Sequence, residues 1–155
     1  MTNQLRDEIK QTRPFTGPQE EAYLSVERTA AVLGHALADA LKVHGITPTQ
    51  YNVLRILRGA GEAGLCRNEI RDRLIAQVPD VTRLLDRMED AGLVGRERGT
   101  QDRRFVTTRI SPEGTKLLTE LDEPVRRLHA RLLEQLSGAE LETLIALLAK
   151  ARSGA

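Results

Sequence analysis

The spacing of apolar residues changes at Gly92, and this change limits the possible folds more than any other feature of the sequence. Before it, four apolar residues recur at positions i, i+3, i+4 and i+7, namely Val81, Leu84, Leu85 and Met88. This spacing predicts an amphipathic helix over residues 79–91. We expect Pro79 in its first turn, where a missing N–H is tolerated, and Gly92 as the left-handed residue that ends it.

After Gly92 the pattern has the two-residue period of a β-strand, with Val106, Thr108 and Ile110 on one face. Residues 99–102, Gly-Thr-Gln-Asp, are turn formers without an apolar anchor, which favours a hairpin. A helix followed directly by a hairpin with a basic tip is typical of a winged helix-turn-helix. In that arrangement the second helix enters a major groove of DNA and the wing reaches the neighbouring minor groove.

The distribution of charge supports this interpretation more than the net charge, which is only +1. Residues 95–109 contain five arginines against Glu97 and Asp102, a local charge of +3. A concentrated basic patch on a near-neutral chain is the footprint expected for phosphate. The alternative is a basic hairpin that is simply solvated.

The chain before the winged helix is predicted to contain a tail and one long helix. Residues 1–18 are polar and end in turn formers, so we expect a flexible tail with a short helical piece around residues 5–9. Residues 19–44 form the long helix, in which apolar residues alternate at spacings of four and three, as in a packed helical seam.

Capping residues mark the start of the next two helices. Thr47 precedes Pro48 in a capping box, so a helix begins there and runs to a glycine-rich loop around residues 59–64. A further helix is predicted over residues 67–75. Cys66 precedes it, and a thiol is a poorer cap than a hydroxyl.

Two more helices are predicted after the hairpin, each opened by a serine cap, Ser111 and Ser137. Pro124 is expected to kink the first or to leave one carbonyl unpaired. Together with the helix over residues 19–44, they carry more apolar surface than the winged helix can cover, so we expect them to pair with a second copy. The alternative is a monomer. The predicted dimerisation residues are Val26, Leu33, Leu37, Leu121, Val125, Leu128, Leu132, Leu144 and Leu148.

The run PDVTRLLDRMEDAGLV, followed by the pattern R-x-R-x3-DRR-x5-IS-PEG, resembles the MarR (multiple-antibiotic-resistance regulator) family of bacterial transcription factors. The resemblance covers residues 20–152 in element order and is most specific over residues 69–114. The chain departs from the family pattern at Cys66, Ile75 and Gln77, which replace a Ser or Thr cap, a turn Gly and a Ser cap.

The resemblance implies a mainly α fold with a small β-hairpin. One domain over residues 19–152 would contain a winged helix over residues 47–111 and dimerisation helices over residues 19–44 and 112–152. It also implies a homodimer that presents two recognition helices to successive major grooves of a near-palindromic operator. A small aromatic effector would bind between the dimer helices and the DNA-binding lobe and alter the affinity for DNA.

On the recognition helix, the candidate DNA-binding residues are Pro79, Asp80, Thr82, Arg83 and Arg87. Arg83 is expected to point outward and to contact a guanine edge, and Thr82 a base or a phosphate. Asp80 either accepts from a cytosine amino group or serves as a charge in the first helical turn. We expect Asp86 and Asp90 to pair with Arg83 and Arg87 one turn away rather than to contact DNA.

On the wing, the candidates are Arg96, Arg98, Asp102, Arg103 and Arg104. The resemblance implies that Arg104 enters the minor groove and that Asp102 helps to hold it, with Arg103 as the alternative inserting residue. Narrow A·T-rich grooves attract such an arginine. Arg96 and Arg98 are interpreted as phosphate contacts, which position the protein without specifying sequence.

Other function classes have little support. The three histidines, His35, His44 and His129, have no acidic partner at a motif spacing, and no catalytic or nucleotide-binding motif is present, so we expect neither an enzyme nor a cofactor. A thiol- or metal-responsive regulator is an alternative, although Cys66 is the only cysteine. One cysteine and no apolar run of membrane-spanning length indicate a cytoplasmic protein.

The sequence therefore predicts a homodimeric, sequence-specific DNA-binding transcription regulator, a repressor, and the resemblance implies that a small-molecule effector releases it. The alternative from another class is a helical dimer that binds other proteins and does not read DNA. The two hypotheses make different predictions for Arg83 and Arg104. A regulator needs both arginines to bind DNA, whereas a protein-binding dimer would bind its partner without them.

Overall fold

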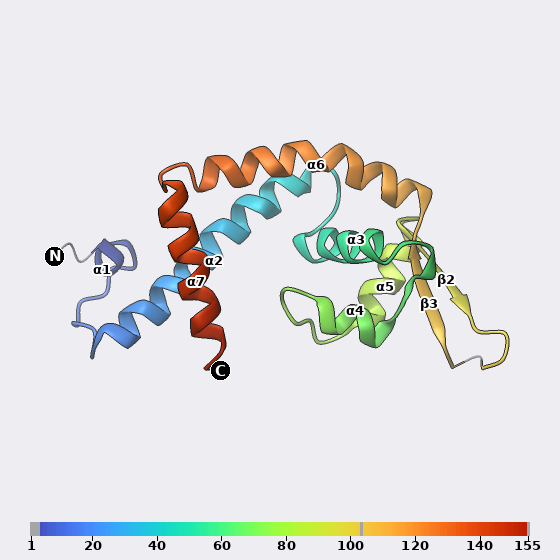
Figure 1. Cartoon of the computed structure of the whole chain (residues 1–155), viewed down its shortest axis with the longest axis horizontal. Coiled ribbons are helices and arrows are strands. Elements are labelled where there is room, and N and C mark those ends of the chain that lie inside the picture. Colours follow the sequence, from blue (N-terminus) through green and yellow to red (C-terminus); the bar gives the residue numbers. More distant parts are fainter. Residues whose placement is uncertain (1–3, 103, 155) are drawn as a thin grey trace. The chain divides into compact units, whose positions relative to one another are not determined.

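Helices dominate the computed structural model, which describes residues 4–102 and 104–154. Figure 1 labels the elements along the chain. The chain forms two compact units, Met1–Pro48 and Thr49–Ala155, and each is described by itself. The mainly helical class with a small sheet confirms the predicted fold class. A single domain over residues 19–152 stays a prediction.

The first unit contains helix α1 (Gln4–Glu8) and the long helix α2 (Pro18–Lys42). The short helix lies where a helical piece was predicted within the polar tail. The connection to α2 is held locally, because the Glu20 carboxylate accepts bonds from the Thr16 N–H at 2.5 Å and from its hydroxyl at 2.8 Å. These bonds hold the pKa of Glu20 below its ordinary value, and the bond from the Thr16 backbone contributes most.

The second unit begins with the winged-helix lobe. Its elements are α3 (Pro48–Ala60), the 3-10 turn η1 (Gly61–Ala63), β1 (Leu65–Cys66), α4 (Arg67–Arg73), α5 (Val81–Asp90), β2 (Val94–Arg98) and β3 (Val106–Ile110). The apolar stripe of each helix supplies the core of the lobe, in which Val53, Leu54, Leu57, Ile70, Leu85 and Met88 are buried. The helix-then-hairpin order predicted from the change of period is therefore confirmed.

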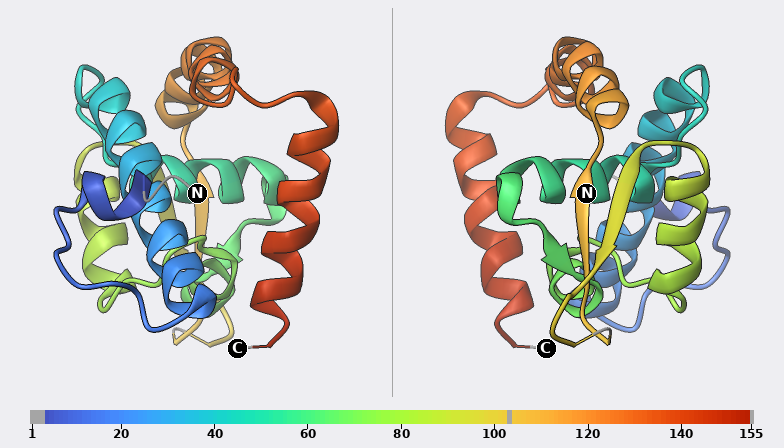
Figure 2. Two further views of the ribbon diagram at one scale, coloured as in Figure 1. Left: turned by 90° about the vertical axis from the view of Figure 1, so that its left-hand side faces the viewer. Right: turned by 90° about the vertical axis from the view of Figure 1, so that its right-hand side faces the viewer.

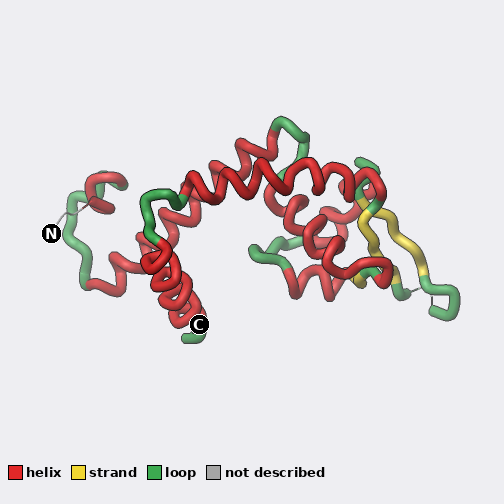
Figure 3. The backbone as a smooth tube through the Cα atoms, turned by 45° about the horizontal axis from the view of Figure 1, so that its top comes forward, coloured by secondary structure: helices red, strands yellow, loops and turns green. Residues whose placement is uncertain are grey.

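The sheet has three strands in the order β1-β3-β2, all antiparallel. The pairing of β2 with β3 is the predicted hairpin, and the described part of the connecting loop projects from the lobe (Figure 3). Strand β1 was not predicted. It pairs Leu65 with Thr108, and Gly64 before it permits the close approach, since a Cβ there would lie 2.6 Å from the Thr108 carbonyl oxygen.

The turn between α4 and α5 differs from the prediction at both ends. Helix α4 ends at Arg73 rather than at residue 75, because Leu74 has extended backbone angles. Helix α5 begins at Val81, so the prediction that Pro79 lies in its first turn is wrong. Asp80 is the N-cap instead, and its carboxylate accepts a bond of 2.9 Å from the Arg83 N–H.

The end of α5 has the predicted glycine. Gly92 has a φ of +75°, its N–H bonds to the Glu89 carbonyl, and the next N–H, from Leu93, bonds to the Met88 carbonyl. This pair of bonds is a Schellman motif, which satisfies carbonyls that the helix leaves free. It sets the direction in which β2 leaves the recognition helix.

Helices α6 (Pro112–Leu132) and α7 (Gly138–Arg152) complete the second unit, and their predicted caps, Ser111 and Ser137, are confirmed. In Figure 1, α6 runs from the sheet to a turn that leads into α7, and Figure 2 shows the same connection from two sides. Helix α6 continues through Pro124, which is exposed and has no N–H to donate to the carbonyl one turn earlier.

The predicted dimerisation residues fall into two groups. Leu121, Val125 and Leu128 are buried in the single chain, so they already serve its core. The others are exposed or half-buried, and α7 buries none of its residues.

Candidate nucleic-acid interface

Helix α5 turns one face into the lobe and leaves the other free. Val81, Leu85 and Met88 are buried, whereas Thr82, Arg83 and Arg87 are exposed. Among the residues that the structure describes, neither Arg83 nor Arg87 forms an ion pair. Their guanidinium groups are therefore available to an outside acceptor, whereas we expected them to pair with Asp86 and Asp90.

Asp80 sits at the start of that helix as its N-cap. Since its Oδ1 already accepts from the Arg83 N–H, the carboxylate favours the helical conformation of the first turn. The structure therefore shows Asp80 as the N-cap and not as a charge within the first helical turn. The contact with a cytosine stays a prediction.

The wing tip presents an arginine that its own loop holds. Asp102 Oδ1 accepts from the Arg104 backbone N–H at 2.9 Å and from its Nε at 3.2 Å. The Arg104 side chain is nevertheless 91% exposed, so its outer nitrogens face solvent. The loop closes through a bond of 2.7 Å from the Gly99 N–H to the Phe105 carbonyl. Arg103, the alternative inserting residue, lies outside the described residues.

Arg96 has different surroundings from those predicted for a phosphate contact. Its Nη2 lies 2.6 Å from Asp86 Oδ1 and 2.5 Å from Glu89 Oε2, and its Nε lies 2.8 Å from the same Glu89 oxygen. The side chain is only 22% exposed. These bonds raise the pKa of Arg96 above its ordinary value, and those to Glu89 contribute most, so Arg96 stays cationic.

The partners of the acidic residues on α5 therefore differ from the prediction. The expected pairing of Asp86 with Arg83 is wrong, because Asp86 pairs across the turn with Arg96. Asp90 forms no ion pair within the described part of the chain. On the central strand β3, Arg109 donates to Glu62 O at 2.6 Å and to Glu97 at 2.9 Å. Arg98 on β2 is exposed.

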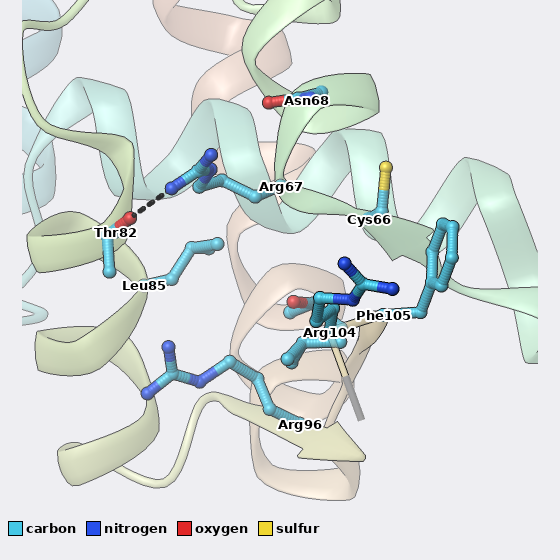
Figure 4. A pocket seen from close by; sticks show the side chains of 10 residues that line it. Cys66, Arg67, Asn68, Thr82, Leu85, Arg96, Arg104 and Phe105 are labelled. Atoms are coloured by element: carbon cyan, nitrogen blue, oxygen red, sulfur yellow. Dashed lines mark hydrogen bonds between the residues drawn. The ribbon is translucent and has the colours of Figure 1, made fainter. Parts of the chain in front are cut away.

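A cleft of about 320 Å³ lies between the start of α4, helix α5 and the sheet (Figure 4). At its edge the Arg67 guanidinium donates to the Thr82 hydroxyl at 3.1 Å, which ties the two helices of the motif together. Phe105 lines the opposite edge and is 66% exposed. Cys66 also lines the cleft and is half-buried.

Three features of this surface were missed by the sequence reasoning: the contact of Arg67 with Thr82, the exposed Phe105 and the partners of Arg96. The sequence gives a weak indication of the first two. Arg67 is an outward arginine at a helix start, and Phe105 is an aromatic residue beside the basic run. Nothing in the sequence indicates the partners of Arg96, because they depend on how β2 packs against α5.

No cluster of three or more potential metal ligands occurs among the residues described. Within those residues, no helix combines the length and the apolar character needed to cross a membrane.

Comparison with known proteins gives a consistent result. The sequence profile of the MarR family matches residues 46–106. The chain is 34% identical over 122 residues to the HTH-type transcriptional regulator YkoM of Bacillus subtilis, with 78% of this chain and 77% of that protein covered.

Two solved structures resemble the chain over most of its length. A MarR transcription factor from Planctomyces limnophilus is 39% identical, with a TM-score of 0.69, and the match covers 88% of this chain and 98% of that one. The MepR–DNA complex of Staphylococcus aureus is 27% identical, with a TM-score of 0.78 and coverage of 92% and 100%.

Proposed function

This chain belongs to the MarR family of transcriptional regulators, and from that premise we propose that it binds a near-palindromic operator in double-stranded DNA as a homodimer. One observation carries the proposal: the recognition helix and the wing of one lobe both present exposed arginines, Arg83 and Arg104. The similarity to MepR, whose structure was solved with DNA, supports it.

Within each half-site we assign two kinds of contact. Arg83 reads a base edge in the major groove, with Thr82 and Arg87 beside it and Asp80 and Pro79 at the leading edge. On the wing, Arg104 enters the minor groove, held by Asp102, with Arg103 next to it. Arg98 contacts phosphate, which adds affinity without sequence preference.

Helix α7 supports the homodimer. It buries none of its residues, and Ile145 and Leu147 are 66% and 59% exposed. Apolar side chains on several faces of one helix are typical of an element that a partner covers. We propose that α7 and the exposed part of α2, including Val26, form the dimer contact together with Leu132, Leu144 and Leu148.

We further propose that the protein acts as a repressor in the cytoplasm and that a small aromatic effector lowers its affinity for the operator. This part rests on membership of the family. A differential affinity of the effector for the free and the DNA-bound conformations would be required for such release.

The test is a selection of bound duplexes from a random pool with the purified protein, followed by titration of the selected duplex against salt. We expect an inverted repeat with half-sites about one helical turn apart and a steep dependence on salt. Arg83→Ala should relax the sequence preference, and Arg104→Ala should weaken binding. Arg131→Ala, an exposed arginine at the end of α6, is the matched control and should change neither.

Failure to enrich any sequence, with a dimer still present by light scattering, would favour the alternative of a helical protein-binding module. In that case Arg83→Ala and Arg104→Ala would leave partner binding unchanged.

A further inference from the structure

The wing strand is joined to the recognition helix by side chains as well as by the chain itself. Arg96 extends from β2 toward α5 (Figure 4), where its guanidinium meets Asp86 and Glu89 on successive turns of the helix. Its Nη2 contacts both carboxylates, and its Nε adds a second bond to Glu89. One arginine thus links two points of the helix to one point of the strand.

This cluster differs from the other charged groups of the surface. The Arg96 side chain is 22% exposed, against 91% for Arg104 on the same wing. Glu89 and Asp86 are 39% and 50% exposed, so both carboxylates are more exposed than the arginine that they contact. A phosphate contact through Nε or Nη2 of Arg96 would require these nitrogens to leave Asp86 and Glu89.

We infer that Arg96 is a positioning residue for operator binding, which fixes the wing relative to the recognition helix so that both reach one half-site together. Asp86 and Glu89 are its partners in this role. The inference rests on the proposed function, since it concerns how the two DNA-contacting elements are held.

The Schellman bonds set the direction in which β2 begins, and Arg96 adds a side-chain contact with α5 farther along the strand. Only Ala91, Gly92 and Leu93 separate α5 from β2, and Gly92 is in the left-handed region. The wing tip lies farther along the strand, so a small rotation at this turn moves Arg104 substantially. Fixing that rotation in the free protein lowers the conformational entropy lost on binding, which raises affinity without a new contact.

The proposal and the phosphate-contact alternative predict opposite signs for the same substitution. Asp86→Asn removes a negative charge near the DNA and one partner of Arg96. If Arg96 contacts phosphate, this change frees the arginine, reduces repulsion and tightens binding. If Arg96 positions the wing, binding weakens about three- to tenfold despite the loss of repulsion.

The experiment measures operator affinity for wild type, Asp86→Asn and Glu89→Gln, with Asp90→Asn as the matched control. Asp90 lies on the same helix and forms no ion pair in the part of the chain described, so its substitution should leave affinity unchanged or slightly tighter. We expect both Asp86→Asn and Glu89→Gln to bind more weakly. Affinity equal to or above that of Asp90→Asn in both variants would overturn the proposal.

Two further measurements separate positioning from a general loss of structure. Arg96→Gln should weaken binding with the salt slope unchanged, whereas Arg98→Gln, on the same strand, should reduce the slope by about 0.9 per lost phosphate contact. In the Arg104→Ala background, Asp86→Asn should have a smaller effect than in wild type, because the wing then lacks the main minor-groove contact that Arg96 would align. Additive effects, or a reduced slope for Arg96→Gln, would contradict the proposal.

The proposed function fails separately. If the wild-type protein selects no sequence, the regulator assignment is wrong whatever the variants do. If wild type binds its operator, and Asp86→Asn and Glu89→Gln bind it with the same affinity as wild type, only the positioning role is wrong. Unfolding temperature and dimer mass are measured for every variant, and the comparison uses those in which both match wild type.

Discussion

The structure defines Asp80 as the residue that caps the start of α5. Its carboxylate accepts the Arg83 N–H at 2.9 Å, so we predict that Asp80→Ala lowers the free energy of unfolding by about 1 kcal/mol. Asp80→Ser keeps a capping oxygen and should lose less. Denaturant unfolding at one fixed protomer concentration measures both. Equal losses for alanine and serine would show that capping is not the contribution of Asp80.

The sequence identified the outward residues of α5 but not their partners. Helical spacing places Thr82, Arg83 and Arg87 away from the apolar stripe, and this follows from the 3.6-residue period alone. The cap itself was not identified, because the family pattern places it at Gln77 and Pro79 fits a first helical turn. The partner of Asp86 could not be predicted, since the helical i, i+4 rule favours neighbours on α5 over an arginine on another strand.

At the scale of elements, the docking of α6 on the turn after α5 depends on Gly114. A Cβ at this residue would collide with the backbone carbonyl oxygen of Leu93 and would lie 3.0 Å from Ile110 Cγ1. The Ser111 hydroxyl and N–H fix the same approach through bonds to Gly92 O at 2.5 Å and Leu93 O at 3.0 Å. The first turn of α6 therefore has no space for a side chain at residue 114.

We predict that Gly114→Ala destabilises the fold by roughly 1–3 kcal/mol, the range for overpacking a close contact. Gly59→Ala is the matched control. Gly59 lies inside α3, and a Cβ added there would meet nothing within 4 Å, so the same change should be neutral or stabilise the helix by about 0.5–1 kcal/mol. Thermal unfolding of the two variants distinguishes a steric effect from a general effect of alanine. Similar shifts of the unfolding temperature in both variants would contradict the steric role of Gly114.

Elements with strong local signals were predicted well. The serine caps before α6 and α7, and the Gly92 stop after α5, each depend on residues within one turn of the chain. Strand β1 was missed because Leu65 and Cys66 are too few to show a two-residue period, and the strand exists only through its pairing with β3. The early end of α4 was missed because Leu74 continues the apolar pattern although its backbone is extended.

At the scale of the whole molecule, apolar stripes do not reveal what covers them. The same 3-4 spacing produced Leu121, Val125 and Leu128, which are buried in the single chain, and Leu144, which is 36% exposed. Periodicity says that a face is apolar, whereas the choice between the chain's own core and a second copy depends on tertiary packing. The exposed residues are therefore the better candidates for the dimer contact.

A long-range ion pair of the second unit joins the winged-helix lobe to α6. Arg58 on α3 donates to both carboxylate oxygens of Asp122, at 2.8 and 2.9 Å. This bond is the main reason that the pKa of Asp122 lies below its ordinary value. Both side chains are partly exposed, at 39% and 47%, so solvent screens the pair and its contribution is about 1 kcal/mol or less.

The direction of this pKa shift fixes how stability should depend on pH. A carboxylate whose pKa is lower in the folded state stabilises the fold above its unfolded pKa, near 3.9, and loses that contribution as pH falls through the lowered value. We therefore predict that Asp122→Asn unfolds more easily than wild type at pH 7 and that the difference shrinks below about pH 4. Denaturant unfolding at both pH values measures it, with Glu120→Gln, an exposed neighbour on α6, as the control. A difference that persists undiminished at pH 3 would show that the ionised carboxylate is not its source.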